Sequence, residues 1–340
     1  MDLFAGPGGL DVAARDLGLP VSGIEWDDDA CATRKAAGLV TQPGDVREFG
    51  PSDFPNATVL AGGPPCQTFT VAGTGAGRKA LETVLEYVER MGRGDDVTKD
   101  LQRLDDERTG LVLEPLRWVL EAEKTGSPYD VIVLEQVQSV LPVWGAVAKV
   151  LKKFHYSTEF GVLRTEEYGV PQTRRRAILI ARRKGEGPDA TLPQTTHQPY
   201  RKGVGPDVGS SKHKPWISMG EALGRDDKFV VISNYGTGGD PKLRGRRRSD
   251  EPAATVTGKI FRNRVQTMDG KELDRFSPAE AGLLQTFPAD YPWSGQDVAQ
   301  QIGNAIPPLL ARHVLTEALG LGEPSYSEAE AGMFDFAVSR

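Results

Sequence analysis

One cysteine lies among residue types that favour nucleophilic chemistry. Cys66 belongs to the tetrad Pro64-Pro65-Cys66-Gln67, which follows a strand-like apolar run at 57–61 and two glycines. The prolines restrict the backbone before it, and the loop after it is rich in Gly and Thr. A packing cysteine normally lies inside an apolar run instead. We therefore expect Cys66 to be a nucleophile at the mouth of an α/β sheet.

A glycine-rich segment at the N-terminus predicts a ligand-binding turn. Residues 2–9, Asp-Leu-Phe-Ala-Gly-Pro-Gly-Gly, lead from a strand into a helix. Gly6, Gly8 and Gly9 allow the backbone to approach a ligand at the helix N-terminus. The spacing differs from the dinucleotide fingerprint G-x-G-x-x-G, so a simple tight turn explains this segment equally well when it is taken alone.

Polar and aromatic residues at later strand ends indicate an adenosine-bearing ligand. The second strand ends in Glu25-Trp26, where a carboxylate can hold ribose hydroxyls and an indole can stack on adenine. Asp45 follows Gly44 and is placed to bond the adenine amino group. These residues predict a cofactor lying across the carboxyl ends of the strands.

Two further segments carry groups suited to a ring under attack. The buried-type strand 131–134 ends in Glu135, which can donate a proton to a ring nitrogen, although a surface acid or helix cap is the simpler explanation for an isolated Glu. Arg174 and Arg176 alternate along an extended segment and should share one face. One arginine can bond a ring carbonyl while the other anchors a phosphate or carboxylate. A basic strand edge that discourages aggregation is the competing explanation.

The spacing of apolar runs predicts an α/β fold with a mostly parallel sheet. Short β-branched runs alternate with amphipathic stretches over the first 180 residues. A second, smaller region follows a Gly- and Pro-rich stretch, and helical periodicity then returns. Predicted strands are 1–4, 21–26, 58–61, 131–134, 157–163, 177–181, 229–233 and 253–257, and predicted late helices are 278–286 and 304–319.

Composition narrows the class of protein. The 340 residues carry a net charge of −6, two cysteines without metal-type spacing, and no apolar stretch long enough to span a membrane. We expect a cytoplasmic protein with no bound metal and no membrane association. Basic residues nevertheless gather in one segment, which favours phosphate contacts there. They are Lys242, Arg244, Arg246, Arg247, Arg248, Lys259, Arg262 and Arg264.

In order, these segments resemble the motifs of the C5-cytosine DNA methyltransferase family. The match is dispersed over most of the chain and is highly specific. The matching residues are 2–9, Glu25-Trp26, Asp45, 62–67, Glu135-Gln136-Val137, Gln172 with Arg174 and Arg176, 251–257 and 301–308.

The resemblance implies a Rossmann-like class I methyltransferase domain with a smaller target-recognition domain. It implies that Cys66 adds to C6 of a flipped cytosine, that Glu135 engages N3 and the exocyclic amine, and that Arg176 holds O2. S-adenosylmethionine is the implied methyl donor, and double-stranded DNA the implied partner. Implied cofactor residues are Phe4, Gly6, Gly8, Gly9, Glu25, Trp26, Asp45, Pro65 and Asn304, and implied DNA contacts are Gln67, Arg244, Arg246, Arg247 and Arg248.

The expected domains are 1–183 for catalysis, 184–275 for target recognition, 276–323 for a hinge and return, and 324–340 for a mobile tail. We expect a monomer on DNA, working in a bacterial or viral host cell with or without a cognate restriction endonuclease. Two readings compete with a DNA methyltransferase: an RNA cytosine-5 methyltransferase, and a DNA-binding protein with impaired catalysis.

Two features depart from the family pattern. Gln136 replaces the usual Asn, so the residue expected to brace the catalytic loop is one methylene longer. Extra residues lie between Gly75 and Leu104, where Leu81, Val84, Leu85 and Val88 repeat at helical spacing. They predict an amphipathic helix that either packs on the protein or extends the DNA contact.

Overall fold

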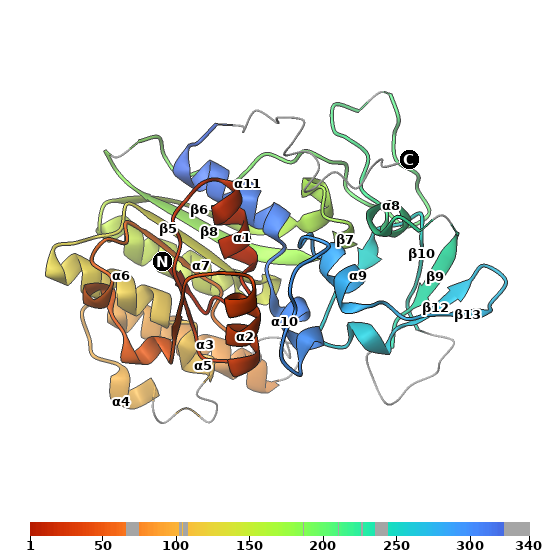
Figure 1. Cartoon of the computed structure of the whole chain (residues 1–340). Coiled ribbons are helices and arrows are strands. Elements are labelled where there is room, and N and C mark those ends of the chain that lie inside the picture. The colour runs from red at the N-terminus through yellow and green to blue at the C-terminus, as the bar shows by residue number, and fades with distance from the viewer. Residues whose placement is uncertain are drawn as a thin grey trace.

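The computed structural model describes residues 1–65, 75–101, 104, 108–185, 187–209, 211–225, 227–234 and 244–322. A seven-stranded sheet in the order β3-β2-β1-β4-β5-β8-β6 forms the larger part of the molecule (Figure 1). Six of its strands run parallel, and β8 runs antiparallel to both neighbours. This arrangement confirms the predicted Rossmann-like fold. The strands are β1 (Asp2–Leu3), β2 (Gly23–Glu25), β3 (Thr41–Pro43), β4 (Val59–Gly62), β5 (Val131–Val137), β6 (Tyr156–Arg164) and β8 (Arg175–Arg183).

The sheet differs from the sequence prediction at two places. Strand β3 was not predicted, because Thr41–Pro43 is short and partly exposed. Strand β5 was expected to end before Glu135 but continues to Val137. Its pairing with β8, in which Val137 lies opposite Arg176, extends it beyond the apolar run. Glu135 therefore lies within a strand, which restricts its side chain more than a loop position would.

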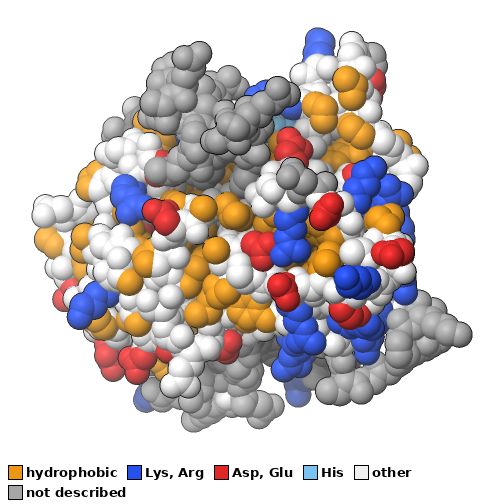
Figure 2. All heavy atoms as spheres, turned by 45° about the vertical axis from the view of Figure 1, so that its right-hand side comes forward, with side chains coloured by type: hydrophobic (Ala, Val, Ile, Leu, Met, Phe, Trp, Pro, Cys, Tyr) orange, Lys and Arg blue, Asp and Glu red, His pale blue; other side chains and the backbone are white. Residues whose placement is uncertain are grey.

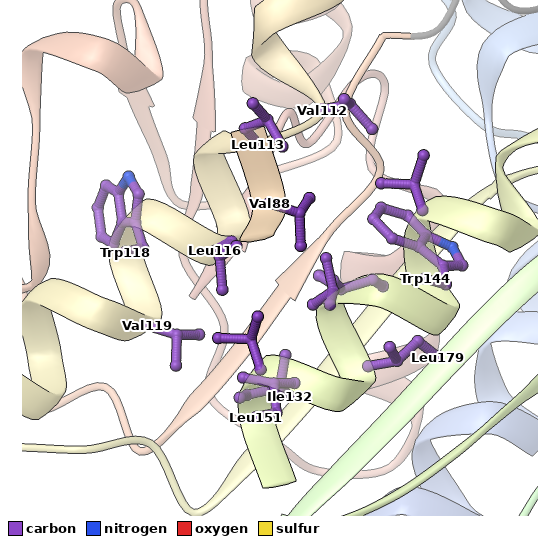
Figure 3. Packing of buried hydrophobic residues seen from close by; sticks show 14 of the residues in the cluster. Val88, Val112, Leu113, Leu116, Trp118, Val119, Ile132, Trp144, Leu151 and Leu179 are labelled. Atoms are coloured by element: carbon purple, nitrogen blue, oxygen red, sulfur yellow. The ribbon is translucent and has the colours of Figure 1, made fainter. Parts of the chain in front are cut away.

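Helices cover both faces of the sheet, and each face has its own apolar core. Helices α3, α6 and α7 pack on one face, where Ile132, Leu179 and Trp144 are buried together (Figure 3). Helices α1 and α11 pack on the other face. The helices are α1 (Gly9–Asp16), α2 (Asp28–Ala36), α3 (Gly75–Met91), α4 (Thr98–Leu101), α5 (Arg108–Leu111), α6 (Glu114–Thr125), α7 (Leu141–Lys153), α8 (Met219–Leu223), α9 (Pro278–Leu283), α10 (Val298–Asn304) and α11 (Pro308–Leu319).

Helix α3 is the amphipathic helix predicted from the spacing of Leu81, Val84, Leu85 and Val88. Val84 and Val88 are fully buried in the core that α7 shares. Its apolar face therefore contributes to the main core of the larger domain. Whether its polar face also touches DNA stays a prediction.

The smaller region is built on an antiparallel sheet in the order β10-β9-β12-β13 (Figure 1). Its core also contains side chains from α9 and α10, so residues beyond 275 contribute to it. A two-stranded parallel sheet, β7 with β11, joins the two regions. These strands are β7 (Gln172–Thr173), β9 (Phe229–Ile232), β10 (Arg246–Arg248), β11 (Ala253–Ala254), β12 (Arg264–Thr267) and β13 (Glu272–Leu273).

The late helix predicted over 304–319 is interrupted. Asn304 ends α10, and α11 begins at Pro308. Pro307 and Pro308 lack the backbone N–H groups that a continuous helix would need. The interruption leaves Asn304 exposed at the end of a helix rather than at the start of one. The predicted tail, 324–340, lies outside the described residues.

Candidate active site

A cavity of about 1100 Å³ lies at the carboxyl ends of the parallel strands. Its wall contains parts of the N-terminal glycine-rich loop (residues 4–9), which we call the first loop. It also contains Glu25, Asp45, Pro65 and residues from β5, β8 and α10. Segments far apart in the sequence therefore meet at one site. The predicted site residues that line it are Phe4, Gly6, Gly9, Glu25, Trp26, Asp45, Pro65, Glu135, Arg174, Arg176 and Asn304.

The first loop is shaped by positive backbone φ angles. Phe4, Gly6 and Gly8 have φ values of 61°, 53° and 102°. Such a value is unusual for a side chain as bulky as phenylalanine and marks a constrained loop. A Cβ on Gly6 would meet no atom within 4 Å, whereas a Cβ on Gly9 would lie 2.1 Å from the Ile306 carbonyl oxygen. Gly6 thus leaves room on the cavity side, and Gly9 allows close packing.

Gly8 has a different setting from its neighbours. It is the N-cap of α1 and does not line the cavity. A Cβ there would lie 2.2 Å from Leu39 Cδ1. Gly8 is therefore needed for the positive φ of the turn and for close packing against Leu39. It does not offer a surface to a ligand in the cavity.

Glu25 holds the loop and the strand end together. Its carboxylate accepts hydrogen bonds from the backbone N–H groups of Gly6 at 2.6 Å, Trp26 at 2.9 Å and Asp27 at 2.8 Å. Burial raises the pKa of Glu25, and these hydrogen bonds oppose the shift. The side chain of Trp26 is 71% exposed beside the cavity, so one face of the indole is open to a ligand.

Asp45 caps the 3₁₀ turn Val46–Glu48 and forms an ion pair with Arg47 at 2.6 Å. Partial burial acts to raise the pKa of Asp45, but the hydrogen bonds from Arg47 outweigh it and lower the pKa below its ordinary value. Asp45 is therefore an ionised acceptor at neutral pH, which suits a bond from an amino group.

Glu135 and Arg176 form an ion pair inside the cavity. Arg176 Nε lies 2.5 Å from Glu135 Oε1, and each side chain is 11% exposed. Their strands pair directly, since Glu135 is in β5 and Arg176 in β8. A Cβ on Gly63 would lie 3.3 Å from Glu135 Oε2, so the chain leading to Cys66 packs closely against this carboxylate.

Gln136 contacts the segment before the predicted nucleophile. Its side-chain amide donates to the Pro64 carbonyl, and its side-chain oxygen accepts from the Val137 N–H. The longer side chain therefore still braces this loop. Cys66 and Gln67 lie outside the described residues, and Pro65 is the last described residue before them.

Arg174 has partners other than those expected. Its guanidinium is fully buried and donates to the carbonyls of Val256 at 2.8 Å, Gly303 at 2.8 Å and Ala305 at 3.3 Å. Burial lowers its pKa. The expectation that Arg174 would anchor a phosphate or carboxylate is therefore corrected: its two terminal nitrogens donate to these carbonyls and tie the start of β8 to the segments around β11 and α10.

A buried ion pair beneath the first loop was missed by sequence reasoning. Arg34 of α2 donates to both carboxylate oxygens of Asp11, at 2.8 and 2.7 Å, and both side chains are fully buried. Arg34 also donates to the Ala5 carbonyl at 3.4 Å and to Thr41 Oγ1 at 2.9 Å. The pair joins two helices across 23 positions of sequence, so no local pattern signals it.

The basic residues of β10 do not all face the same way, because side chains alternate along a strand. Arg246 and Arg248 are exposed, and Arg248 pairs with Asp250 at 2.6 Å. Arg247 is half-buried, stacks over the Tyr200 ring at 4.5 Å and donates to Thr173 Oγ1 at 3.3 Å. In Figure 2, Lys and Arg side chains gather toward the right of the face shown, with carboxylates between them. The run is therefore not one uniform basic surface.

The described residues contain neither a metal-type cluster nor a membrane-spanning helix. No group of three or more His, Cys, Asp or Glu side chains in these ranges is arranged to hold a metal ion. In the same ranges, no helix has the length and apolar character needed to cross a membrane.

Comparison with known proteins gives one consistent family. Residues 1–93 and 98–319 match the model of the C-5 cytosine-specific DNA methylase family. The type II methyltransferase M1.HphI of Haemophilus parahaemolyticus is 27% identical over 94% of this chain and 86% of its own length. M.NgoFVII of Neisseria gonorrhoeae is 26% identical over 91% and 83%.

Solved structures share the fold. The Dnmt2 methyltransferase of S. pombe superposes with a TM-score of 0.62 at 15% identity, covering 95% of this chain and 98% of its own. A putative DNA modification methyltransferase encoded within an E. coli prophage gives a TM-score of 0.56 at 18% identity, covering 94% and 97%.

Proposed function

Because this chain belongs to the C-5 cytosine-specific DNA methylase family, we propose that Cys66, Glu135 and Arg176 act together on a flipped cytosine in the large cavity. The chain is a DNA cytosine-5 methyltransferase, and S-adenosylmethionine is its methyl donor. The observation that carries the proposal is the convergence of the motif residues from eight separate segments on one cavity.

The cofactor end of the cavity suits an adenosyl group. Gly6 leaves open space, Trp26 presents an indole face, and Asp45 is an ionised acceptor. Glu25 lines the cavity at the strand end and is the residue we assign to the ribose hydroxyls. When bound, S-adenosylmethionine supplies a methyl group on a sulfonium.

At the other end, the residues activate the base. The Cys66 thiolate forms a bond to C6, and the displaced electron pair makes C5 nucleophilic enough to take the methyl group. Glu135 engages N3 and the exocyclic amine, and Arg176 holds O2. The Arg176–Glu135 ion pair fixes both side chains before the base arrives. Loss of the C5 proton to a base and expulsion of the thiolate then restore the ring.

We further assign residues 184–275 to target recognition, with Gln67, Arg244, Arg246 and Arg248 as DNA contacts. A monomer on DNA is expected, because an asymmetric cleft needs no second subunit. Cytoplasmic location and pairing with a restriction endonuclease are supported by the type II methyltransferases that this chain is similar to.

The proposal is tested by incubating the purified protein with unmethylated duplex DNA and labelled S-adenosylmethionine, followed by base-resolution mapping of modified cytosines. A parallel reaction contains transfer RNA in place of DNA. Label at the cytosines of one short duplex motif is the expected result. Label on the RNA alone would mean that the substrate is RNA.

Replacing Trp26 by Ala is expected to weaken S-adenosylmethionine binding about tenfold, because a stacked base contributes about 1–3 kcal/mol. Trp26→Phe keeps an aromatic face and should lose less. Isothermal titration calorimetry without DNA measures both affinities. Equal affinity for Trp26→Ala and the unaltered protein would remove this residue from the cofactor site.

A further inference from the structure

A second cavity, of about 570 Å³, lies beside the catalytic one where the two regions meet. Val137, Arg176 and Thr255 line both cavities, so the two are contiguous. Its other lining residues come from β6, β7, β8, β10 and the loops near them. They are Gln138, Arg164, Glu166, Thr173, Arg175, Tyr200 and Arg247.

Two arginines in this cavity lie directly opposite each other in the sheet. Arg164 of β6 pairs in register with Arg175 of the antiparallel strand β8. Side chains of residues directly opposite point to the same face, and like charges in such a pair destabilise the sheet. Arg164 is 3.9 Å from Glu167, whereas Arg175 makes no ion pair within the described parts of the chain. An anion between the two guanidinium groups would turn this repulsion into attraction.

A third arginine reaches the cavity from the smaller region and is held in place there. Arg247 stacks on Tyr200 at 4.5 Å, and the Tyr200 hydroxyl in turn donates to Glu251 Oε1 at 2.5 Å. One terminal nitrogen of Arg247, Nη1, is buried without a hydrogen-bond partner among the described residues. A buried donor without a partner is costly, so an acceptor that reaches this nitrogen when DNA binds would relieve that cost.

The balance of charge in the cavity favours an anion. Arg176 is already paired with Glu135, which leaves Arg164, Arg175 and Arg247. Glu166 is the single carboxyl among the described lining residues, so it opposes three arginines; burial raises its pKa, and the nearby Arg164 and Arg175 act against that shift. Three arginines around one space form a typical phosphate site.

From this geometry we propose that Arg164, Arg175 and Arg247 form a clamp for one DNA backbone phosphate next to the flipped cytosine. Contiguity with the catalytic cavity places that phosphate beside the target nucleotide. The clamp rests on the proposed flipping of cytosine into the large cavity. Because Arg247 belongs to the recognition region and the other two to the catalytic domain, the phosphate also links the two regions when DNA binds.

The test measures how much each phosphate near the target cytosine contributes to DNA affinity. S-adenosylhomocysteine is present so that no methyl transfer occurs. Duplexes carry a single uncharged methylphosphonate at each position flanking the mapped target cytosine. With the unaltered protein, one flanking position should weaken binding about tenfold, as expected for one charge-assisted contact. In Arg175→Gln and Arg247→Gln, the same methylphosphonate should cost less affinity than it does in the unaltered protein, and a thermodynamic cycle measures that difference.

Each of these variants should also lower the slope of log affinity against log salt, by about one at most because the clamp holds one phosphate. Lys153→Gln removes the same charge from an exposed position that lines neither cavity, and should leave both the slope and the methylphosphonate profile unchanged. Cofactor affinity serves as the check that each variant is folded. Tyr200→Leu should weaken DNA binding more than Tyr200→Phe, because Phe keeps the aromatic ring on which Arg247 stacks.

The results separate this inference from the proposed function. Methylation of duplex DNA without coupling between any flanking phosphate and Arg175 or Arg247 would overturn the clamp and leave the function standing. Coupling of the same size with Lys153→Gln would also overturn it. Failure of the unaltered protein to methylate duplex DNA would instead count against the proposed function.

Discussion

Cys66→Ala is expected to abolish methyl transfer to DNA while leaving S-adenosylmethionine affinity within about twofold of the unaltered protein. Cytosine C5 is too weak a nucleophile to attack a sulfonium without addition at C6, so the loss should be at least about 10⁴-fold. Single-turnover transfer of labelled methyl groups measures the rate, and calorimetry measures cofactor binding. Retention of more than one per cent of the rate would exclude Cys66 as the nucleophile.

The chain offers a matched control in its second cysteine. Cys31 lies in α2, lines neither cavity and donates weakly to the Glu25 carbonyl at 3.4 Å. Burial raises the pKa of the Cys31 thiol to about 11, so it stays protonated at neutral pH. Cys31→Ala should therefore keep methyl transfer.

A covalent trap gives an independent readout of the same step. A duplex with 5-fluorocytosine at the target position is incubated with S-adenosylmethionine. Once C5 has taken the methyl group it carries fluorine in place of the proton, the thiolate cannot be eliminated, and the adduct should persist through denaturing electrophoresis. The adduct should form with the unaltered protein and with Cys31→Ala, and should be absent with Cys66→Ala. An adduct that persists in Cys66→Ala would assign the attack to another group.

Breaking the buried Arg34–Asp11 pair is expected to produce the largest loss of stability. Arg34→Met leaves the Asp11 carboxylate buried and removes the donor to the Ala5 carbonyl, which should lower the free energy of unfolding by about 3–5 kcal/mol. Urea denaturation followed by circular dichroism measures it. Cofactor affinity should fall as well, because Ala5 lies in the first loop.

A double variant measures how far Arg34 and Asp11 contribute to stability through their interaction with each other. Arg34→Met with Asp11→Leu leaves no buried charge from the pair itself and should be more stable than either single variant. Arg93→Met, which breaks an exposed ion pair with Asp95, provides the comparison and should cost about 1 kcal/mol or less. Strict additivity of the Arg34 and Asp11 changes would show that the two side chains are not energetically coupled.

The local motifs could be assigned from the sequence because their meaning depends on neighbouring residues. Glu25 and Trp26 end one predicted strand and Glu135 follows another, and the carboxyl ends of parallel strands meet at one sheet edge. The predicted strands and their parallel arrangement were therefore enough to expect these residues at the same sheet edge. The helix α3 was predicted for a similar reason, since its apolar spacing is contained in one segment.

The remaining features depended on pairings between distant segments. Register between β6 and β8 puts Arg164 opposite Arg175, and a shift of one residue would separate them. The packing of α1 on α2 joins Asp11 to Arg34, and the alternation of β10 directs Arg247 away from Arg246 and Arg248. The sequence by itself determined which residues are candidates for the methyl-transfer chemistry and which end of the sheet they should share. Tertiary structure decided how the arginines are shared between the core, the catalytic cavity and the second cavity, because charge burial and cross-strand register arise only when distant segments pack together.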